Sequence, residues 1–224
     1  MKTTSIMIVG VGGQGTLLAS KLLGNVLIGA GYDVKLSEVH GMSQRGGSVV
    51  TYVRYGDKVY SPIVDQGEAD YILSFEILES ARWISYLKKG GNSALPEEGL
   101  RAQAQSAQPQ DAPETRGQAE RRTGGGKLIT NTQKTWPMPV ITGAMPYPEN
   151  IVEKLSAMAD VQAVDALALA TRAGSPKAVN VVLIGVLSKL MDIPEAAWLK
   201  AIEETVPQKF LELNKKAFAL GREA

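Results

Sequence analysis

Three side chains that can carry chemistry lie within one short glycine-rich segment. Glu38, His40 and Arg45 fall between residues 38 and 47 (EVHGMSQRGG), and His40 is the only histidine of the chain. An imidazole can move a proton near neutral pH, and a guanidinium can hold a phosphate or carboxylate through two parallel hydrogen bonds. A purely structural loop rarely needs this mixture, so the segment is a candidate part of an active site.

Each of these side chains also has a structural interpretation, which the sequence leaves open. Glu38 is either the acid that binds ribose in a nicotinamide-binding fold or the ion-pair partner of Arg45. His40 is a proton shuttle, a hydrogen-bond donor to a ligand, or only a structural contact. Arg45 binds a phosphate or carboxylate, or forms a surface salt bridge. We take His40 and Arg45 as candidate catalytic residues, and Glu38 and Gly46 as candidate ligand-binding residues.

A second glycine-rich segment, GVGGQG at residues 10–15, follows an apolar run typical of a buried strand. A strand, a glycine-rich turn and a helix together direct backbone N–H groups and a helix N-terminus at a phosphate, although a turn without a ligand is the alternative. The side-chain amide of Gln14 can fix the turn or bind a ligand. The candidate cofactor-binding residues here are Gly10, Gly12, Gly13, Gln14 and Gly15.

The hydrophobic pattern predicts the elements that position these two segments. The expected strands are residues 5–10, 33–39, 48–55, 58–61, 71–75, 127–131 and 161–165. The expected helices cover 16–30 and 76–89, with four more opening near Pro148, Pro176, Pro194 and Pro207. Residues 5–39 would form a β-α-β unit, and Gly56-Asp57 suits the turn of an antiparallel hairpin. We therefore expect an α/β, Rossmann-like three-layer sandwich with a mixed sheet and a helical C-terminal part.

The chain is expected to form a single domain over residues 1–224 with one insertion. Residues 92–126 contain only two large aliphatic side chains, Leu95 and Leu100, and interrupt a helix-to-strand connection. We predict that this insertion is disordered, with a short solvated helix over 100–108 as the alternative. The stiff apolar segments 137–139 and 146–148 suit either a subunit contact or a rigid connection. Asn180 is either a buried capping amide or a polar contact to the glycine-rich turn.

The composition excludes several classes of function. Lys+Arg 24 against Asp+Glu 23 gives no support to a nucleic-acid or membrane partner. With no cysteine, the chain cannot hold a disulfide, a thiolate nucleophile or a cysteine-ligated cluster, and one histidine leaves little for zinc. No metal site is expected. The longest apolar run, 179–187, is too short to span a bilayer and no signal peptide is evident, so we expect a cytoplasmic protein.

The two glycine-rich motifs also carry a family resemblance. GVGGQG at 10–15, SEVHGMSQRGG at 37–47 and YSPIVDQGEAD at 60–70 together resemble the gamma-type subunit of the 2-oxoacid:ferredoxin oxidoreductases. The resemblance covers about residues 6–91 and resumes at Lys127. Pyruvate-type relatives carry tyrosine-glycine-proline-glutamate before the arginine, whereas HGMSQ at 40–44 favours an arylpyruvate type such as indolepyruvate.

This resemblance implies oxidative decarboxylation of a 2-oxoacid to an acyl group on coenzyme A. Thiamine diphosphate and 4Fe–4S clusters would carry the chemistry, with ferredoxin as electron acceptor. Because the chain lacks cysteine and a Gly-Asp-Gly thiamine motif, both cofactors are expected on a large catalytic partner subunit, and this chain alone would be inactive. It would help form the coenzyme A and substrate site with Gly12, Gly13, Gln14, His40, Arg45 and Gly46.

Two other functions remain open from the sequence. Gly10, Gly12, Gly15 and Glu38 suit a free-standing NAD- or FAD-dependent oxidoreductase, although the predicted hairpin breaks the usual topology and no separate substrate domain is evident. A non-catalytic scaffolding subunit, whose glycine-rich turn only shapes an interface, is the second alternative.

Overall fold

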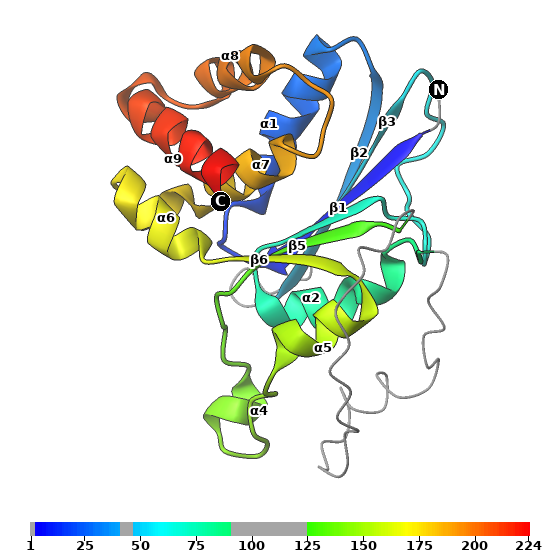
Figure 1. Cartoon of the computed structure of the whole chain (residues 1–224), viewed down its shortest axis with the longest axis vertical. Coiled ribbons are helices and arrows are strands. Elements are labelled where there is room, and N and C mark those ends of the chain that lie inside the picture. The colour runs from blue at the N-terminus through cyan, green and yellow to red at the C-terminus, as the bar shows by residue number, and fades with distance from the viewer. Residues whose placement is uncertain (1–2, 41–46, 91–124) are drawn as a thin grey trace.

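A six-stranded mixed sheet forms the centre of the computed structural model, which describes residues 3–40, 47–90 and 125–224 (Figure 1). The strand order is β2-β3-β1-β4-β5-β6. Strands β4, β5 and β6 run parallel to β1, whereas β3 runs antiparallel to β1 and β2. The strands are β1 (Thr4–Val11), β2 (Asp33–His40), β3 (Ser48–Gly56), β4 (Tyr71–Ser74), β5 (Lys127–Asn131) and β6 (Asp160–Val164). The predicted α/β fold with a mixed sheet is confirmed.

Helices cover both faces of this sheet, with α1, α6, α7, α8 and α9 on one side and α2 and α5 on the other (Figure 1). The α-helices are α1 (Thr16–Gly29), α2 (Ile77–Trp83), α4 (Met138–Ile141), α5 (Ile151–Met158), α6 (Ala166–Ala173), α7 (Val179–Ser188), α8 (Glu195–Thr205) and α9 (Leu211–Glu223). Short 3-10 helices are η1 (Ile84–Tyr86), η2 (Pro176–Ala178) and η3 (Gln208–Phe210). Among the described residues, no helix is long and apolar enough to cross a membrane.

The apolar run of β1 is continuous because both faces of this strand are buried. Ile6 and Ile8 belong to the core shared with α1 and α7. Met7 and Val9 belong to a second core, shared with α2 and α5. Successive side chains of a strand point to opposite faces, so a central strand under two helical layers needs no polar residue.

The position of β3 differs from the expected arrangement. β1 and β2 are parallel, as a β-α-β unit requires, but β3 lies between them and pairs with both. The antiparallel hairpin is thus β2 with β3, and the hairpin predicted at Gly56-Asp57 is wrong. A strand at 58–61 would need a free edge of β3, and neither edge is free. Instead, the backbone N–H of Val59 donates to the Asp33 carboxylate at 2.8 Å, across the start of β2.

The helix predicted for residues 76–89 ends early. α2 stops at Trp83 and continues only as η1, because the chain then pairs with the segment before β4. The backbone N–H of Lys88 donates to the carbonyl of Ala69 at 2.9 Å, and the Lys88 Nζ atom lies 2.5 Å from a carboxylate oxygen of Asp70. The predicted extension of this helix to residue 89 is therefore wrong. The predicted insertion, apart from Gly125 and Gly126, lies outside the described residues.

Most of the predicted helices of the C-terminal part are present with shifted starts. η2 begins at Pro176 and leads into α7, whereas α8 begins directly after Pro194 and η3 directly after Pro207. The helix expected near Pro148 begins at Ile151, after an Asn150 in the left-handed conformation. Helices α4 and α6 were not predicted. Helices α6, α7, α8 and α9 pack with α1 on one face of the sheet (Figure 1).

Candidate functional site

The turn between β1 and α1 depends on glycine at several positions. Gly13 and Gly15 have positive φ angles of 93° and 81°, which side chains other than glycine rarely adopt. A Cβ atom on Gly15 would also lie 2.8 Å from Nδ2 of Asn180. A Cβ atom on Gly10 would lie 2.8 Å from Oε1 of Gln14. The glycine spacing therefore reflects both backbone conformation and close packing.

The side chain of Gln14 holds this turn against the sheet. Its Oε1 atom accepts from the backbone N–H of Val11 at 2.9 Å, and its Nε2 atom donates to the carbonyl of Phe75 at 3.3 Å. The Asn131 amide donates to the same carbonyl at 3.2 Å. Because Val11, Phe75 and Asn131 end or directly follow β1, β4 and β5, this network lies at the carboxyl end of the sheet. Both side-chain bonds of Gln14 described here fix the turn.

Asn180, in the first turn of α7, also contacts the glycine-rich turn. Its Nδ2 atom donates to the carbonyl of Gly15 at 3.4 Å, and only 5% of Asn180 is exposed. Its Oδ1 atom accepts from the next backbone N–H, that of Val181. Of the two sequence interpretations, the contact to the glycine-rich turn is therefore present in the structure.

The two glycine-rich motifs meet at one hydrogen bond. The backbone N–H of Gly12 donates to the carbonyl of Gly47 at 2.9 Å. The sheet register supports this contact, since His40 pairs with Val49 and Val49 pairs with Gly10. His40 and Gly10 are therefore in one row, two strand spacings or roughly 10 Å apart. Residues 41–46, which include Arg45 and Gly46, and the side chain of His40 lie outside the described part of the chain.

Glu38 is not placed where a dinucleotide-binding fold places its ribose acid. That acid ends a strand directly beside the first strand. Here Glu38 pairs with Thr51 of β3, and Thr51 pairs with Ile8 of β1, so one whole strand separates Glu38 from β1. This geometry removes the main argument for a nicotinamide-binding function.

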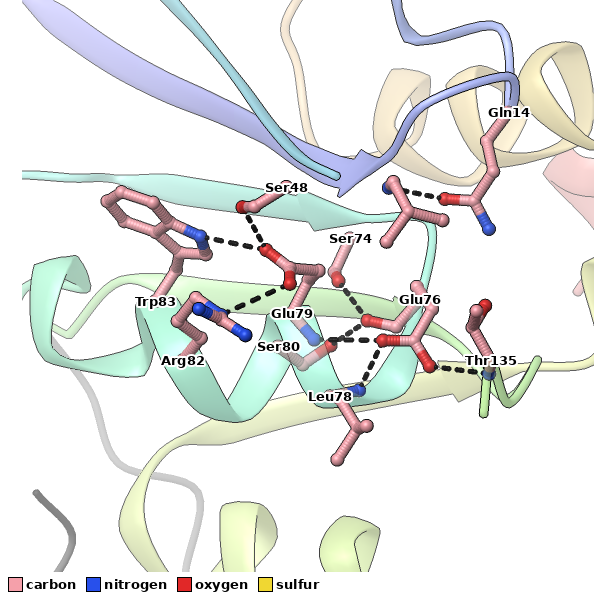
Figure 2. Close-up of polar contacts among 11 residues, drawn as sticks. Gln14, Ser48, Ser74, Glu76, Leu78, Glu79, Ser80, Arg82, Trp83 and Thr135 are labelled. Atoms are coloured by element: carbon pink, nitrogen blue, oxygen red, sulfur yellow. Dashed lines mark hydrogen bonds and ion pairs between the residues drawn. The ribbon is translucent and has the colours of Figure 1, made fainter. Parts of the chain in front are cut away.

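A buried carboxylate, which was not among the predicted site residues, connects β3 to α2 (Figure 2). Glu79 is only 3% exposed. Its carboxylate accepts from Oγ of Ser48 at 2.5 Å and from Nε1 of Trp83 at 3.1 Å, and pairs with Nε of Arg82 at 3.1 Å. Ser48 directly follows Gly47, so Glu79 fixes the residue next to the one that accepts the hydrogen bond from Gly12.

A second buried carboxylate, Glu76, caps α2 and reaches the segment after β5 (Figure 2). It accepts from the backbone N–H groups of Leu78 at 2.7 Å, Glu79 at 3.0 Å and Thr135 at 2.9 Å. Burial raises the pKa of the Glu76 carboxyl, against the lowering effect of these three donors. The sequence signal for both acids was their place at the front of a predicted helix, where carboxylates stabilise the exposed N–H groups.

The start of α1 has the features of an anion-binding helix N-terminus. Gly15 caps this helix without a side-chain hydrogen bond, and the first turn holds no acidic residue. The first backbone N–H groups of a helix have no partner within it and attract negative charge. In contrast, the described residues contain no group of three or more His, Cys, Asp or Glu side chains placed to hold a metal ion.

Comparison with known proteins places this site in a family. The family model described as pyruvate ferredoxin/flavodoxin oxidoreductase matches residues 5–224. The indolepyruvate oxidoreductase subunit IorB of Pyrococcus horikoshii is 39% identical over 232 residues, covering 100% of this chain and 96% of the relative.

Solved structures share the fold at lower identity. The gamma subunit of a keto/oxoacid ferredoxin oxidoreductase from Geobacter sulfurreducens superposes with a TM-score of 0.62 at 22% identity, covering 98% of this chain and 96% of that one. A 2-oxoglutarate:ferredoxin oxidoreductase from Magnetococcus marinus superposes with a TM-score of 0.65 at 17% identity, covering 100% of this chain but only 31% of its own. With the family model matching almost the whole sequence, this chain belongs to the pyruvate ferredoxin/flavodoxin oxidoreductase family.

Proposed function

We propose that this chain is the small subunit of a 2-oxoacid:ferredoxin oxidoreductase that acts on indolepyruvate or a related arylpyruvate. The full-length similarity to an indolepyruvate oxidoreductase subunit supports this assignment. The HGMSQ sequence at 40–44 favours the same substrate class. The complex would form acyl-coenzyme A and pass electrons to ferredoxin.

The cofactors of this reaction would lie on a larger partner subunit. Iron–sulfur clusters in proteins of this kind need cysteine thiolates, and the chain contains none. The residues of this chain therefore do not fit a cluster, and the sequence also lacks a Gly-Asp-Gly thiamine motif. A cysteine-free chain suits the reducing cytoplasm, where we place the complex.

This chain would contribute binding groups at the carboxyl end of its sheet. The observation that carries this proposal is the Gly12–Gly47 hydrogen bond, which brings the two family motifs together. The uncapped start of α1 and the guanidinium of Arg45 would bind a coenzyme A phosphate or the substrate carboxylate. His40 would donate a hydrogen bond or move a proton at the same edge.

Purification of the chain alone and together with the co-expressed large subunit tests this division of labour. The chain alone should show no iron–sulfur absorbance and no indolepyruvate- and coenzyme A-dependent reduction of a viologen dye. The complex should show both. Cluster absorbance or turnover from this chain by itself would contradict the proposal, whereas saturable NADH binding would support the nicotinamide alternative.

A further inference from the structure

An arm formed by residues 133–149 leaves the sheet after β5, carries α4 and returns to α5 (Figure 1). Between Lys134 and Glu149 the arm has no charged residue. Three of its large apolar side chains are exposed: Trp136 by 57%, Met138 by 65% and Ile141 by 63%. Single exposed apolar residues are ordinary, but three within one charge-free segment indicate an interaction surface.

The arm is ordered by its own contacts. The backbone N–H of Ile141 donates to the carbonyl of Pro137 at 3.0 Å. The ring centroids of Trp136 and Tyr147 lie 5.2 Å apart. This contact joins the segment that leads out to α4 with the segment that returns from it. Little conformational freedom is left to lose on binding, so a partner would meet a preorganised surface.

The base of the arm is clamped to α2 and to the end of the sheet. Glu76 accepts from the backbone N–H of Thr135 at 2.9 Å, and the backbone N–H of Ile77 donates to the carbonyl of Gln133 at 3.2 Å. The Gln133 side chain accepts from the Asn131 amide at 3.3 Å. The arm therefore projects from a fixed base.

The same amide connects the arm to the glycine-rich turn. Asn131 donates to the carbonyl of Phe75, which also accepts from Gln14. The arm and the turn are thus held at one end of the sheet through a single shared carbonyl. Leu17, in the first turn of α1 beside that turn, is a further apolar side chain at this end and is 62% exposed.

We propose that the arm docks into an apolar, charge-poor recess on the large catalytic subunit, and so sets the glycine-rich turn against that subunit's active site. This inference rests on the proposed function. We assign this occupant because the base of the arm is joined to the glycine-rich turn through Asn131 and the carbonyl of Phe75. In the 2-oxoglutarate:ferredoxin oxidoreductase structure, moreover, the region of this fold makes up 31% of one longer chain. A domain of this fold therefore exists covalently joined to further parts of such an enzyme.

A matched pair of substitutions tests the proposal in the complex. Ile141 on the arm and Ile28 in the last turn of α1, toward the other end of the sheet, are both 63% exposed. Each residue lies at the C-terminal end of its helix, where the helix dipole favours a positive charge. A lysine is therefore tolerated electrostatically at either position. Titration calorimetry with the large subunit of the same organism should show at least a tenfold weaker Kd for Ile141→Lys and an unchanged Kd for Ile28→Lys. Both isolated variants should keep the wild-type melting temperature.

Wild-type affinity of Ile141→Lys would overturn the docking proposal and leave the proposed function standing. If Ile141→Lys lowered the melting temperature, Met138→Lys would replace it in the same titration, with the same two outcomes. Sedimentation of the chain alone provides a second measurement. A homodimer that Ile141→Lys dissociates would make a second copy the occupant and also overturn the proposal. A wild-type complex that assembles but does not oxidise any 2-oxoacid would instead contradict the proposed function.

Discussion

The backbone N–H of Gly12 donates to the carbonyl of Gly47 at 2.9 Å, and this bond continues the ladder between β1 and β3 by one residue. The ladder itself ends where Val11 pairs with Ser48. The two glycine-rich motifs, at residues 10–15 and 37–47, are therefore joined to each other by a main-chain hydrogen bond. A change that loosens either motif should affect the other.

The first prediction compares two glycines of the turn. Gly15→Ala should lower the free energy of unfolding by about 2–4 kcal/mol. The new Cβ would be strained by the positive φ and would also clash with Nδ2 of Asn180, which lies 2.8 Å away. Gly13→Ala has a similar φ but nothing within 4 Å of the new Cβ, so strain alone should cost about 1–2 kcal/mol. Urea unfolding measures both values.

Asn180→Ala provides the control for this comparison. In the Gly15→Ala background it should recover part of the loss, with a coupling free energy of about 1 kcal/mol or more. Equal losses for Gly13→Ala and Gly15→Ala, or the absence of coupling, would show that the Asn180 contact does not constrain the turn.

The second prediction concerns the buried carboxylate of Glu79. Glu79→Gln should destabilise the chain by about 2 kcal/mol, because an amide cannot satisfy Ser48, Trp83 and Arg82 together. Glu204→Gln is the control, because the Glu204 side chain is 58% exposed and its ion pair with Lys200 is long, at 3.9 Å. It should change the unfolding free energy by less than about 0.5 kcal/mol. If the two variants unfold alike, the Glu79 contacts contribute little to holding β3 against α2.

The third prediction concerns the segment between Gly90 and Gly125. A Cβ on Gly125 would lie 2.9 Å from the backbone N of Gly90, so the two ends of the described chain meet. Deleting residues 91–124 and joining Gly90 to Gly125 should change stability by less than about 1 kcal/mol, given the weak dependence of loop closure on length. The join keeps Gly126, whose backbone N–H donates to the carbonyl of Lys88 at 2.9 Å.

Thermal unfolding and assembly with the large subunit measure the effect of this deletion. A loss of several degrees, or failure to assemble, would show that residues 91–124 are required.

Local patterns predicted the elements whose surroundings are uniform. The apolar run at residues 5–10 correctly placed the buried strand β1, and the pattern at 16–30 correctly placed the helix α1 that follows it. The insertion of β3 between β1 and β2 was not predictable, because pairing between strands distant in the chain decides it. The local turn signal at Gly56-Asp57 was overridden for that reason.

The site was predictable to a similar degree. The glycine-rich turn and its contact with Gln14 follow from residues close in the sequence. The supporting carboxylates were missed as site residues because their partners are distant: Ser48 for Glu79, and Thr135 for Glu76. The early end of α2 has the same cause, since Lys88 leaves the helix to pair with Asp70. Such contacts become visible only when the fold brings the segments together.

The most direct test of the proposed shared active site is the steady-state rate of the assembled complex with Arg45 replaced. Arg45 lies in the segment that Gly12 holds at Gly47, although its own position is outside the described residues. Arg45→Ala should lower kcat/KM for indolepyruvate or coenzyme A by about 100-fold, or roughly 3 kcal/mol, with the complex intact. Arg45→Lys should recover only part of this loss, since lysine lacks the bidentate geometry, and Arg172→Ala on α6 should leave the rate unchanged. An Arg45→Ala complex with wild-type kcat/KM, or one that fails to assemble, would contradict the account.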